Sequence, residues 1–135
     1  MNVVFVAGFG PIVREQQVSE AFYAGTLGLA FERDGEYLHT EHLAGVKTFA
    51  LWPLSQAAES CFGAKTWPHD LSAPHAWLEF DVEDLPAATA ELKAKGYTLL
   101  VEAHKEPWGQ LVTRLLSPEG LLVGVTYTPS MRDKQ

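Results

Sequence analysis

The stretch YLHTEH, residues 37–42, brings two histidines and one glutamate within four consecutive positions. Imidazole nitrogens and carboxylate oxygens are the ligands by which proteins hold zinc, nickel and iron. In a β-strand, however, alternate side chains lie on opposite faces. His39 and Glu41 would therefore share one face with Tyr37, while His42 would lie on the other. One strand thus offers a pair of metal ligands at most, and a solvated polar face is the alternative interpretation.

Tryptophan is the second residue type that could form a ligand site, because the chain holds four of them: Trp52, Trp67, Trp77 and Trp108. Aromatic rings in a cleft favour planar or cationic ligands through stacking and cation–π contacts, each worth about 0.5–2 kcal/mol. The same side chains are also common in cores and at interfaces. Glu79 lies two residues beyond Trp77, on the same face of a strand. Its carboxylate could pair with a ligand cation there or act as a general base.

Length and charge narrow the classes of partner. A chain of 135 residues fits a single domain, which buries enough surface to fold without a structural metal. The single cysteine, Cys61, excludes an internal disulfide and suits the cytoplasm. The net charge of −7 argues against nucleic acid, and Gly8, Gly10 and Pro11 interrupt the apolar N-terminus well before the length of a membrane span. We therefore expect a cytoplasmic protein whose partner is a small molecule, with neither nucleic acid nor membrane.

Hydrophobic patterning predicts the same order of elements twice. The first half has a strand, a helix and three strands at 2–9, 15–27, 29–33, 36–43 and 46–53. The second half has the corresponding elements at 76–82, 85–95, 97–102, 110–116 and 121–127. Gly28 and Gly96 follow the two helices at equivalent points, as glycine does at helix C-termini. Residues 55–74 show no sustained period and are predicted to form the connection, which is long enough to carry function.

Two copies of one supersecondary unit predict an α+β fold, in which two βαβββ modules form curved mixed sheets around a cleft. The chain would then be one domain, residues 1–135, with module one over about 1–56, a connection over about 57–74 and module two over about 75–128. A cleft between two such modules is the expected ligand site.

The register of two predicted hairpin strands indicates which residues of the first module face the cleft. If residues 44–45 form a two-residue turn, His39 lies opposite Ala50 and Glu41 lies opposite Thr48. Tyr37, His39, Glu41, Thr48 and Trp52 would then share one face with Ala50, and they line the cleft if Ala50 does.

The register of the last two strands is predicted in the same way. The sequence Ser-Pro-Glu-Gly at 117–120 is typical of a β-turn. Pairing the strands back from this turn places Thr113 beside Gly124, so Thr113 faces the cleft if Gly124 does. Arg114 would then point outward, as a structural or dimer-contact residue.

Three sequence segments carry a resemblance to a known family. AFYAGTLGLAFERD (21–34) resembles an FYxxxLG helix end, and WLEFDVEDLPAATAELKAKG (77–96) resembles a strand, acidic turn and second helix. PWGQLVTRLLSPEGLLVGV (107–125) resembles a PWG loop and a closing DPDG hairpin, with Ser117 and Glu119 in place of the two aspartates. In these motifs the chain resembles the vicinal-oxygen-chelate superfamily, which includes glyoxalase I, extradiol dioxygenases, fosfomycin-resistance enzymes and bleomycin-resistance proteins. The resemblance implies paired βαβββ modules and a homodimer.

Members of this family that use a metal hold it in the cleft through His or Glu side chains at four strand positions. Counted from the nearest motif, the corresponding residues here are Gly8, Ala50, Trp77 and Gly124. None of the four can bind a metal ion through its side chain. The resemblance therefore implies a cleft without the family's metal centre, and we expect neither a metal nor another cofactor.

The sequence thus favours a metal-free protein of the bleomycin-resistance type, which binds a small organic ligand, cationic or aromatic, in an acidic cleft. Such a protein would confer antibiotic resistance by sequestering the ligand. The residues expected to bind the ligand are Tyr37, His39, Glu41, Trp52, Trp77, Glu79, Trp108 and Thr113.

Two other classes of function stay open. The first is an enzyme of the same superfamily, lyase or dioxygenase-like, that acts on a small metabolite. It would use a metal held by His39, Glu41 and further residues, or else Glu79 or Glu41 as an acid–base group without metal. The second is a regulatory or structural dimer, in which side chains would fill the cleft.

Overall fold

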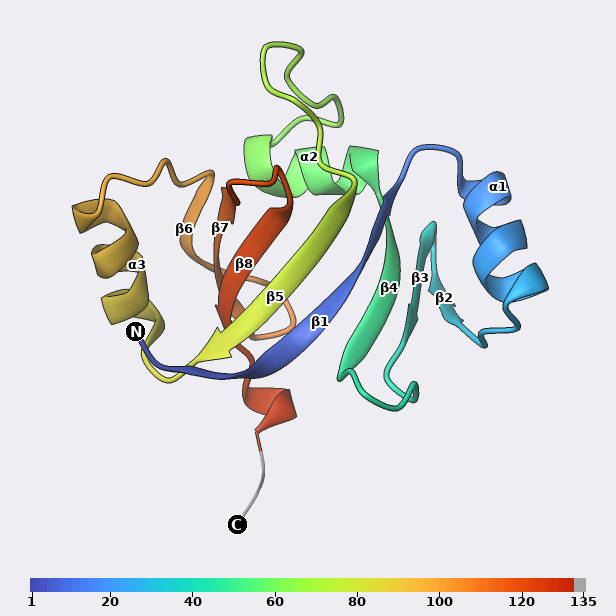
Figure 1. Cartoon of the computed structure of the whole chain (residues 1–135), viewed down its shortest axis with the longest axis horizontal. Coiled ribbons are helices and arrows are strands. Elements are labelled where there is room, and N and C mark those ends of the chain that lie inside the picture. Colours follow the sequence, from blue (N-terminus) through green and yellow to red (C-terminus); the bar gives the residue numbers. More distant parts are fainter. Residues whose placement is uncertain (133–135) are drawn as a thin grey trace.

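The structure is a computed structural model that describes residues 1–132, and it confirms the α+β architecture (Figure 1). The first module contains β1 (Val3–Val13), α1 (Gln16–Glu20), the π-helix η1 (Ala21–Thr26), β2 (Glu32–Asp34), β3 (Tyr37–Thr40) and β4 (Thr48–Pro53). The second module contains β5 (Ala76–Val82), α3 (Leu85–Ala94), β6 (Val101–Lys105), β7 (Leu111–Leu116) and β8 (Leu122–Tyr127). Helix α2 (Leu54–Phe62) connects the modules, and the 3-10 helix η2 (Pro129–Met131) follows β8.

The strands form one eight-stranded sheet in the order β2-β3-β4-β1-β5-β8-β7-β6. Strands β1 and β5 pair antiparallel at its centre and join the two modules. In each module the first strand runs parallel to the last, β1 with β4 and β5 with β8. Figure 1 shows α1 and α3 at opposite ends of this sheet, with α2 crossing near the strand ends between them.

The apolar side chains pack on the faces of the strands that the helices cover. In the first module Leu38 and Leu51 are fully buried in a cluster that includes Tyr23 of the π-helix. In the second module Val82 and Val125 pack against α3. Because strand side chains alternate, the residues next to these in sequence point to the opposite face, which faces the space between the modules.

Helix α2 is an element that the sequence patterning missed, since residues 55–74 were predicted to be a connection without regular structure. Its buried residues are Ala57, Ala58 and Cys61, and it is only nine residues long, so its pattern was not recognised within the longer irregular segment. The helix ends at Gly63, whose φ of 75° is in the left-handed region that glycine adopts without strain. Within residues 1–132, no helix is both long and apolar enough to cross a membrane.

Other element boundaries also differ from the prediction. The helix predicted at 15–27 begins as an α-helix but continues with π-type hydrogen bonding, in which the Leu27 N–H donates to the Phe22 carbonyl oxygen (2.9 Å). The strand predicted at 97–102 begins only at Val101, because the N–H of Tyr97 still closes the end of α3 by donating to the Leu92 carbonyl oxygen (3.1 Å).

Candidate functional site

A cavity of about 700 Å³ lies between the two modules, within the size range of small-molecule sites. The first module contributes polar and aromatic side chains from β2, β3 and β4 to its lining. The second module contributes side chains from β5, from β7 and from the loop before it. Besides Ala7, Thr48, Gln56, Ser60, Thr128, Ser130 and Met131, the lining residues are Asp34, Tyr37, His39, Glu41, Trp52, Trp77, Glu79, Glu106, Trp108, Gln110 and Arg114.

Seven of the eight residues predicted to bind a ligand surround this cavity. They are Tyr37, His39, Glu41, Trp52, Trp77, Glu79 and Trp108. The pairing of His39 with Ala50 is as predicted, although the loop between β3 and β4 spans residues 41–47 and is wider than a two-residue turn. That these side chains bind a ligand stays a prediction.

The prediction for Thr113 is wrong, and the reason is a register shift of one residue. Arg114, rather than Thr113, pairs with Gly124, because the loop between Leu116 and Leu122 is one residue longer than assumed. A shift of one exchanges the two faces of a strand. Thr113 therefore lies under α3, where its hydroxyl oxygen is 2.7 Å from that of Thr89, and Arg114 lies in the cavity wall.

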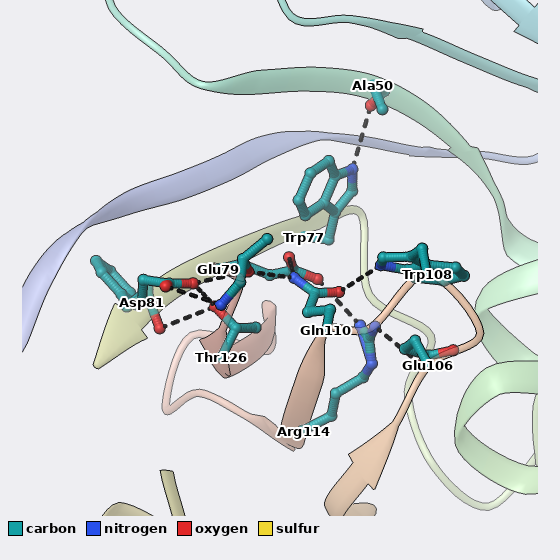
Figure 2. Close-up of polar contacts among 11 residues, drawn as sticks. Ala50, Trp77, Glu79, Asp81, Glu106, Trp108, Gln110, Arg114 and Thr126 are labelled. Atoms are coloured by element: carbon teal, nitrogen blue, oxygen red, sulfur yellow. Dashed lines mark hydrogen bonds and ion pairs between the residues drawn. The ribbon is translucent and has the colours of Figure 1, made fainter. Parts of the chain in front are cut away.

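The Arg114 guanidinium is the centre of a buried ion-pair network (Figure 2). Its side chain is only 4% exposed, and its Nη1 donates to Oε2 of Glu79 at 3.3 Å. Its Nη2 is 3.9 Å from Oε1 of Glu106, and the guanidinium carbon lies 4.9 Å from the centroid of the Trp52 ring. A buried charge is tolerated when it is paired in this way, so the two carboxylates and the ring hold Arg114 in place.

Gln110 links this ion pair to the mouth of the cavity. Its Nε2 donates to Oε1 of Glu79 (3.2 Å) and to Oγ1 of Thr128 (2.9 Å), while its Oε1 accepts from Nε1 of Trp108 (3.1 Å). The Trp108 residue is otherwise 67% exposed. Gln110 was not predicted, because nothing in a single neutral amide distinguishes a buried hydrogen-bonding residue from a surface one.

Burial raises the pKa of Glu79 above its ordinary value, although the Arg114 guanidinium and the Gln110 amide partly oppose the effect. Glu79 therefore keeps its proton to a higher pH than a solvated glutamate does. A carboxyl group with a raised pKa at a cavity wall is a candidate for acid–base chemistry.

The neighbouring Asp81, two residues further along β5, is fully buried and has a structural role. It accepts hydrogen bonds from the hydroxyl groups of Thr126 (2.5 Å) and Thr128 (2.8 Å) and from the Thr128 N–H (3.0 Å). It also forms an ion pair with Arg132 at 2.8 Å. All of these contacts attach the end of β8 to β5, so Asp81 is not free for a ligand.

The part of the cavity lining that comes from the first module, the first-module wall, contains a smaller cluster of polar side chains around His39. The Tyr37 ring stacks on the His39 ring at 5.2 Å between centroids, and Nδ1 of His39 is 2.7 Å from Oε2 of Glu41. Glu32 pairs with His39 across the β2–β3 ladder, and one ligand atom from each of Glu32, His39 and Glu41 lies within 4.8 Å of the others. Burial first, and then the carboxylates of Glu79 and Glu41, raise the pKa of Tyr37, so its phenol stays protonated.

Trp77 joins the two walls. Its side chain crosses β1 from β5, and its Nε1 donates to the carbonyl oxygen of Ala50 on β4 at 3.1 Å (Figure 2). This path requires glycine at position 8, because a Cβ there would lie 2.8 Å from the indole ring. The indole is buried and meets Trp52 edge to face, with ring centroids 6.2 Å apart.

A model of the Glyoxalase/Bleomycin resistance protein/Dioxygenase superfamily matches residues 9–125 of this chain. The match takes in strands of both modules and covers most of the sequence. The chain belongs to this superfamily. No curated protein sequence gave a significant match.

Solved structures of the superfamily share the fold of the chain at low sequence identity. A superfamily member from Vibrio splendidus 12B01 is 18% identical, with a TM-score of 0.60 over 92% of this chain and 98% of that one. Methylmalonyl-CoA epimerase from Mycobacterium tuberculosis is 20% identical, with a TM-score of 0.60 over 96% and 91% of the two chains. A Streptomyces coelicolor methylmalonyl-CoA epimerase in complex with 2-nitronate-propionyl-CoA is 15% identical, with a TM-score of 0.56 over 98% and 100%.

The residues at the positions that correspond to the superfamily's metal ligands do not fit a metal ion. The pairing of the strands puts Glu79, and not Trp77, beside both Gly8 and Gly124. Glu79 is thus a single carboxylate at this place, and it already accepts hydrogen bonds from Arg114 and Gln110. A metal ion there would find no ligand in the side chains of Gly8, Ala50 and Gly124 and would face the positive guanidinium of Arg114.

Proposed function

We propose that this superfamily member binds a small planar organic cation in the cleft between its modules, without a metal ion. The observation that carries the proposal is the composition of the cavity lining, in which aromatic rings alternate with acidic groups. The aromatic residues are Tyr37, Trp52, Trp77 and Trp108, and the carboxylates are Asp34, Glu41, Glu79 and Glu106, against the single guanidinium of Arg114.

Two of the carboxylates are available to a ligand cation. Glu79 and Glu106 are held by Arg114, whereas Asp34 and Glu41 have no Arg or Lys partner among residues 1–132. Aromatic faces attract cations by about 0.5–2 kcal/mol per contact. A planar cation could therefore stack in the cleft and place its charge near the first-module wall, a mode of binding that suits resistance by sequestration.

Fluorescence titration tests this proposal, because three of the four tryptophans line the cavity. Proflavine, a planar cation, should quench the tryptophan emission and bind more tightly than acridine, a planar ring system that is neutral at pH 8. Glu41→Gln should weaken the binding of proflavine and leave that of acridine unchanged. Equal affinity for the two compounds, or no response to either, would overturn the proposal.

A second candidate function is that of an enzyme acting on a small metabolite, and one observation favours it. Glu32, His39 and Glu41 together offer one imidazole and two carboxylates at metal-binding separation, a donor set that suits a divalent cation. Elemental analysis of the protein, purified without a histidine tag, separates the two candidates. Stoichiometric metal that is lost in His39→Ala would replace the metal-free proposal by this one.

A homodimer, which the superfamily resemblance implies, and a location in the cytoplasm both stay predictions. Apolar side chains on β1 that are more than two-fifths exposed, Val4, Val6 and Phe9, could contribute to a dimer interface. Light scattering coupled to gel filtration checks the dimer directly. Cell fractionation checks the location.

A further inference from the structure

A second cavity, of about 630 Å³, lies on the other side of the β4–α2 junction and shares no lining residue with the cleft. Its walls come from the end of β1, the start of α2 and the long segment between α2 and β5. The lining residues are Val13, Arg14, Gln16, Glu36, Pro53, Leu54, Ser55, Lys65, Thr66, Trp67, Pro68, His69, Leu71, Ser72 and Ala73.

The charged groups of this cavity have the opposite balance to those of the cleft. Arg14 and Lys65 line it together with His69, and Glu36 is the only carboxylate of the lining. Within residues 1–132, neither Arg14 nor Lys65 forms an ion pair. In a chain with a net charge of −7, two unpaired cationic side chains at one cavity create a local site of positive potential.

Arg14 is held by backbone hydrogen bonds without being neutralised, and Gln16 lacks hydrogen-bond partners. The Arg14 guanidinium donates to the backbone carbonyl oxygens of Ile12 (2.8 Å) and Ala73 (3.4 Å), which fixes its position but leaves its charge. The amide nitrogen and oxygen of Gln16 are buried and have no hydrogen-bond partner. Buried polar groups without a partner are uncommon and call for one, and a ligand in the cavity could supply it.

The lining also includes an apolar part, formed by Trp67, Leu54 and Leu71. Trp67 is only 7% exposed, and its Nε1 already donates to the carbonyl oxygen of Leu71 (2.9 Å). Its ring packs edge to face on Phe62, at 4.9 Å between centroids. With its N–H engaged, Trp67 offers a ligand mainly apolar ring surface, which Leu54 and Leu71 extend.

From these contacts we propose that the second cavity binds a small aromatic carboxylate. The carboxylate group lies between Arg14 and Lys65, and the ring packs against Trp67. The amide of Gln16 accepts or donates a hydrogen bond at the polar end. This site is independent of the cleft and takes a ligand of opposite charge, so its failure would leave the cation-binding proposal untouched.

The indole N–H signals in a ¹H–¹⁵N correlation spectrum test this proposal, since Trp67 lines this cavity while the other three tryptophans line the cleft. Titration with benzoate should shift the Trp67 signal in a saturable manner and leave the other three in place. Benzamide, the neutral counterpart of benzoate, should give no saturable shift. Shifts confined to the cleft tryptophans, equal responses to the two compounds, or no response to benzoate would each overturn the proposal.

Two matched lysine variants then test whether the charge of Lys65 contributes to benzoate binding. Lys65→Gln should weaken benzoate binding about threefold to fivefold, the range expected for one exposed ion pair. Lys105→Gln makes the same change at an exposed residue that lines neither cavity, and it should leave the affinity unchanged. Equal weakening in both variants would show that benzoate responds only to net charge, and would overturn the proposed site.

Discussion

The two walls of the cleft differ in how their polar side chains are used. In the second-module wall, Arg114 and Glu79 are 4% and 13% exposed and belong to one network of ion pairs and hydrogen bonds with Gln110. In the first-module wall, the side chains of His39 and Glu41 are 23% and 41% exposed, and their polar contact is with each other.

The difference follows from the cost of burying charge. A charged group removed from water needs a partner, so the second-module wall is fixed by its own contacts and forms a rigid side of the cavity. The exposed groups of the first-module wall are still hydrated, and a ligand can replace their water. We therefore expect stability to depend mainly on the second-module wall and ligand binding to depend mainly on the first-module wall.

The largest effect is expected for Arg114→Ala, which removes the centre of the rigid wall. It should lower the free energy of unfolding by about 3–5 kcal/mol, because the Glu79 and Glu106 carboxylates lose their cation while still buried. Urea denaturation followed by circular dichroism measures the change.

Arg33→Ala is the matched control for this prediction. Arg33 also pairs with a glutamate, Glu20, but its side chain is 54% exposed, and exposed pairs contribute about 0–1 kcal/mol. If the two alanine variants lost equal stability, the network around Arg114 would not be the rigid element that the comparison describes.

Gly8→Ala tests the contact by which Trp77 connects the two walls. It should lower the free energy of unfolding by about 1–3 kcal/mol, as overpacking does. A Cβ at this position would lie 2.8 Å from the Thr48 carbonyl oxygen and 2.8 Å from the Trp77 ring, and the backbone oxygen cannot move away easily. Thermal unfolding measures the loss. In Gly25→Ala, where a Cβ has no neighbour within 4 Å, the same experiment should show no loss. A stable Gly8→Ala protein would mean that Trp77 does not lie across β1.

The order of the strands and the residues of the first-module wall could be predicted from the sequence. Alternation along β3 put Tyr37, His39 and Glu41 on one face, and the register with Ala50 was predicted correctly even though the connecting loop proved wider. This succeeded because a hairpin keeps its register when its loop opens symmetrically.

The second-module wall could be predicted only in part. The loop between Leu116 and Leu122 has one residue more than the prediction assumed, because Gly120 adopts a left-handed φ of 86° after the turn. Glycine at this place is typical of a three-residue hairpin loop with a bulge, and the prediction did not use that signal. Because of this one additional residue, Arg114 and not Thr113 lies in the cavity wall. The prediction therefore missed the positive charge at the centre of the site. Helix α2 was missed for a different reason, since it has only nine residues and is followed by a segment without helix or strand up to residue 75, so no period persists over residues 55–74.

Glu79→Gln probes the rigid wall through its pH dependence. Because the pKa of folded Glu79 is raised, the wild-type protein loses stability as the pH rises from the ordinary glutamate pKa through the raised one. The variant has no such proton to lose, so its stability relative to wild type should increase over this interval. Urea denaturation between pH 4 and pH 8 gives the difference, and Glu119→Gln in the exposed β7–β8 loop controls for the removal of one negative charge. A relative stability that stays flat or decreases with pH would contradict the burial of this carboxyl.

The smallest effect on stability is expected for Glu41→Gln in the first-module wall. Its contact with His39 is largely solvated, so the free energy of unfolding should change by less than about 0.5 kcal/mol. The binding of proflavine should nevertheless weaken about threefold to fivefold, because the variant lacks a carboxylate that the ligand cation would approach. Urea denaturation and fluorescence titration of the same preparation measure both quantities. If Glu41→Gln lost stability without losing affinity, the first-module wall would be structural like the second, and the assignment of ligand contacts to it would be wrong.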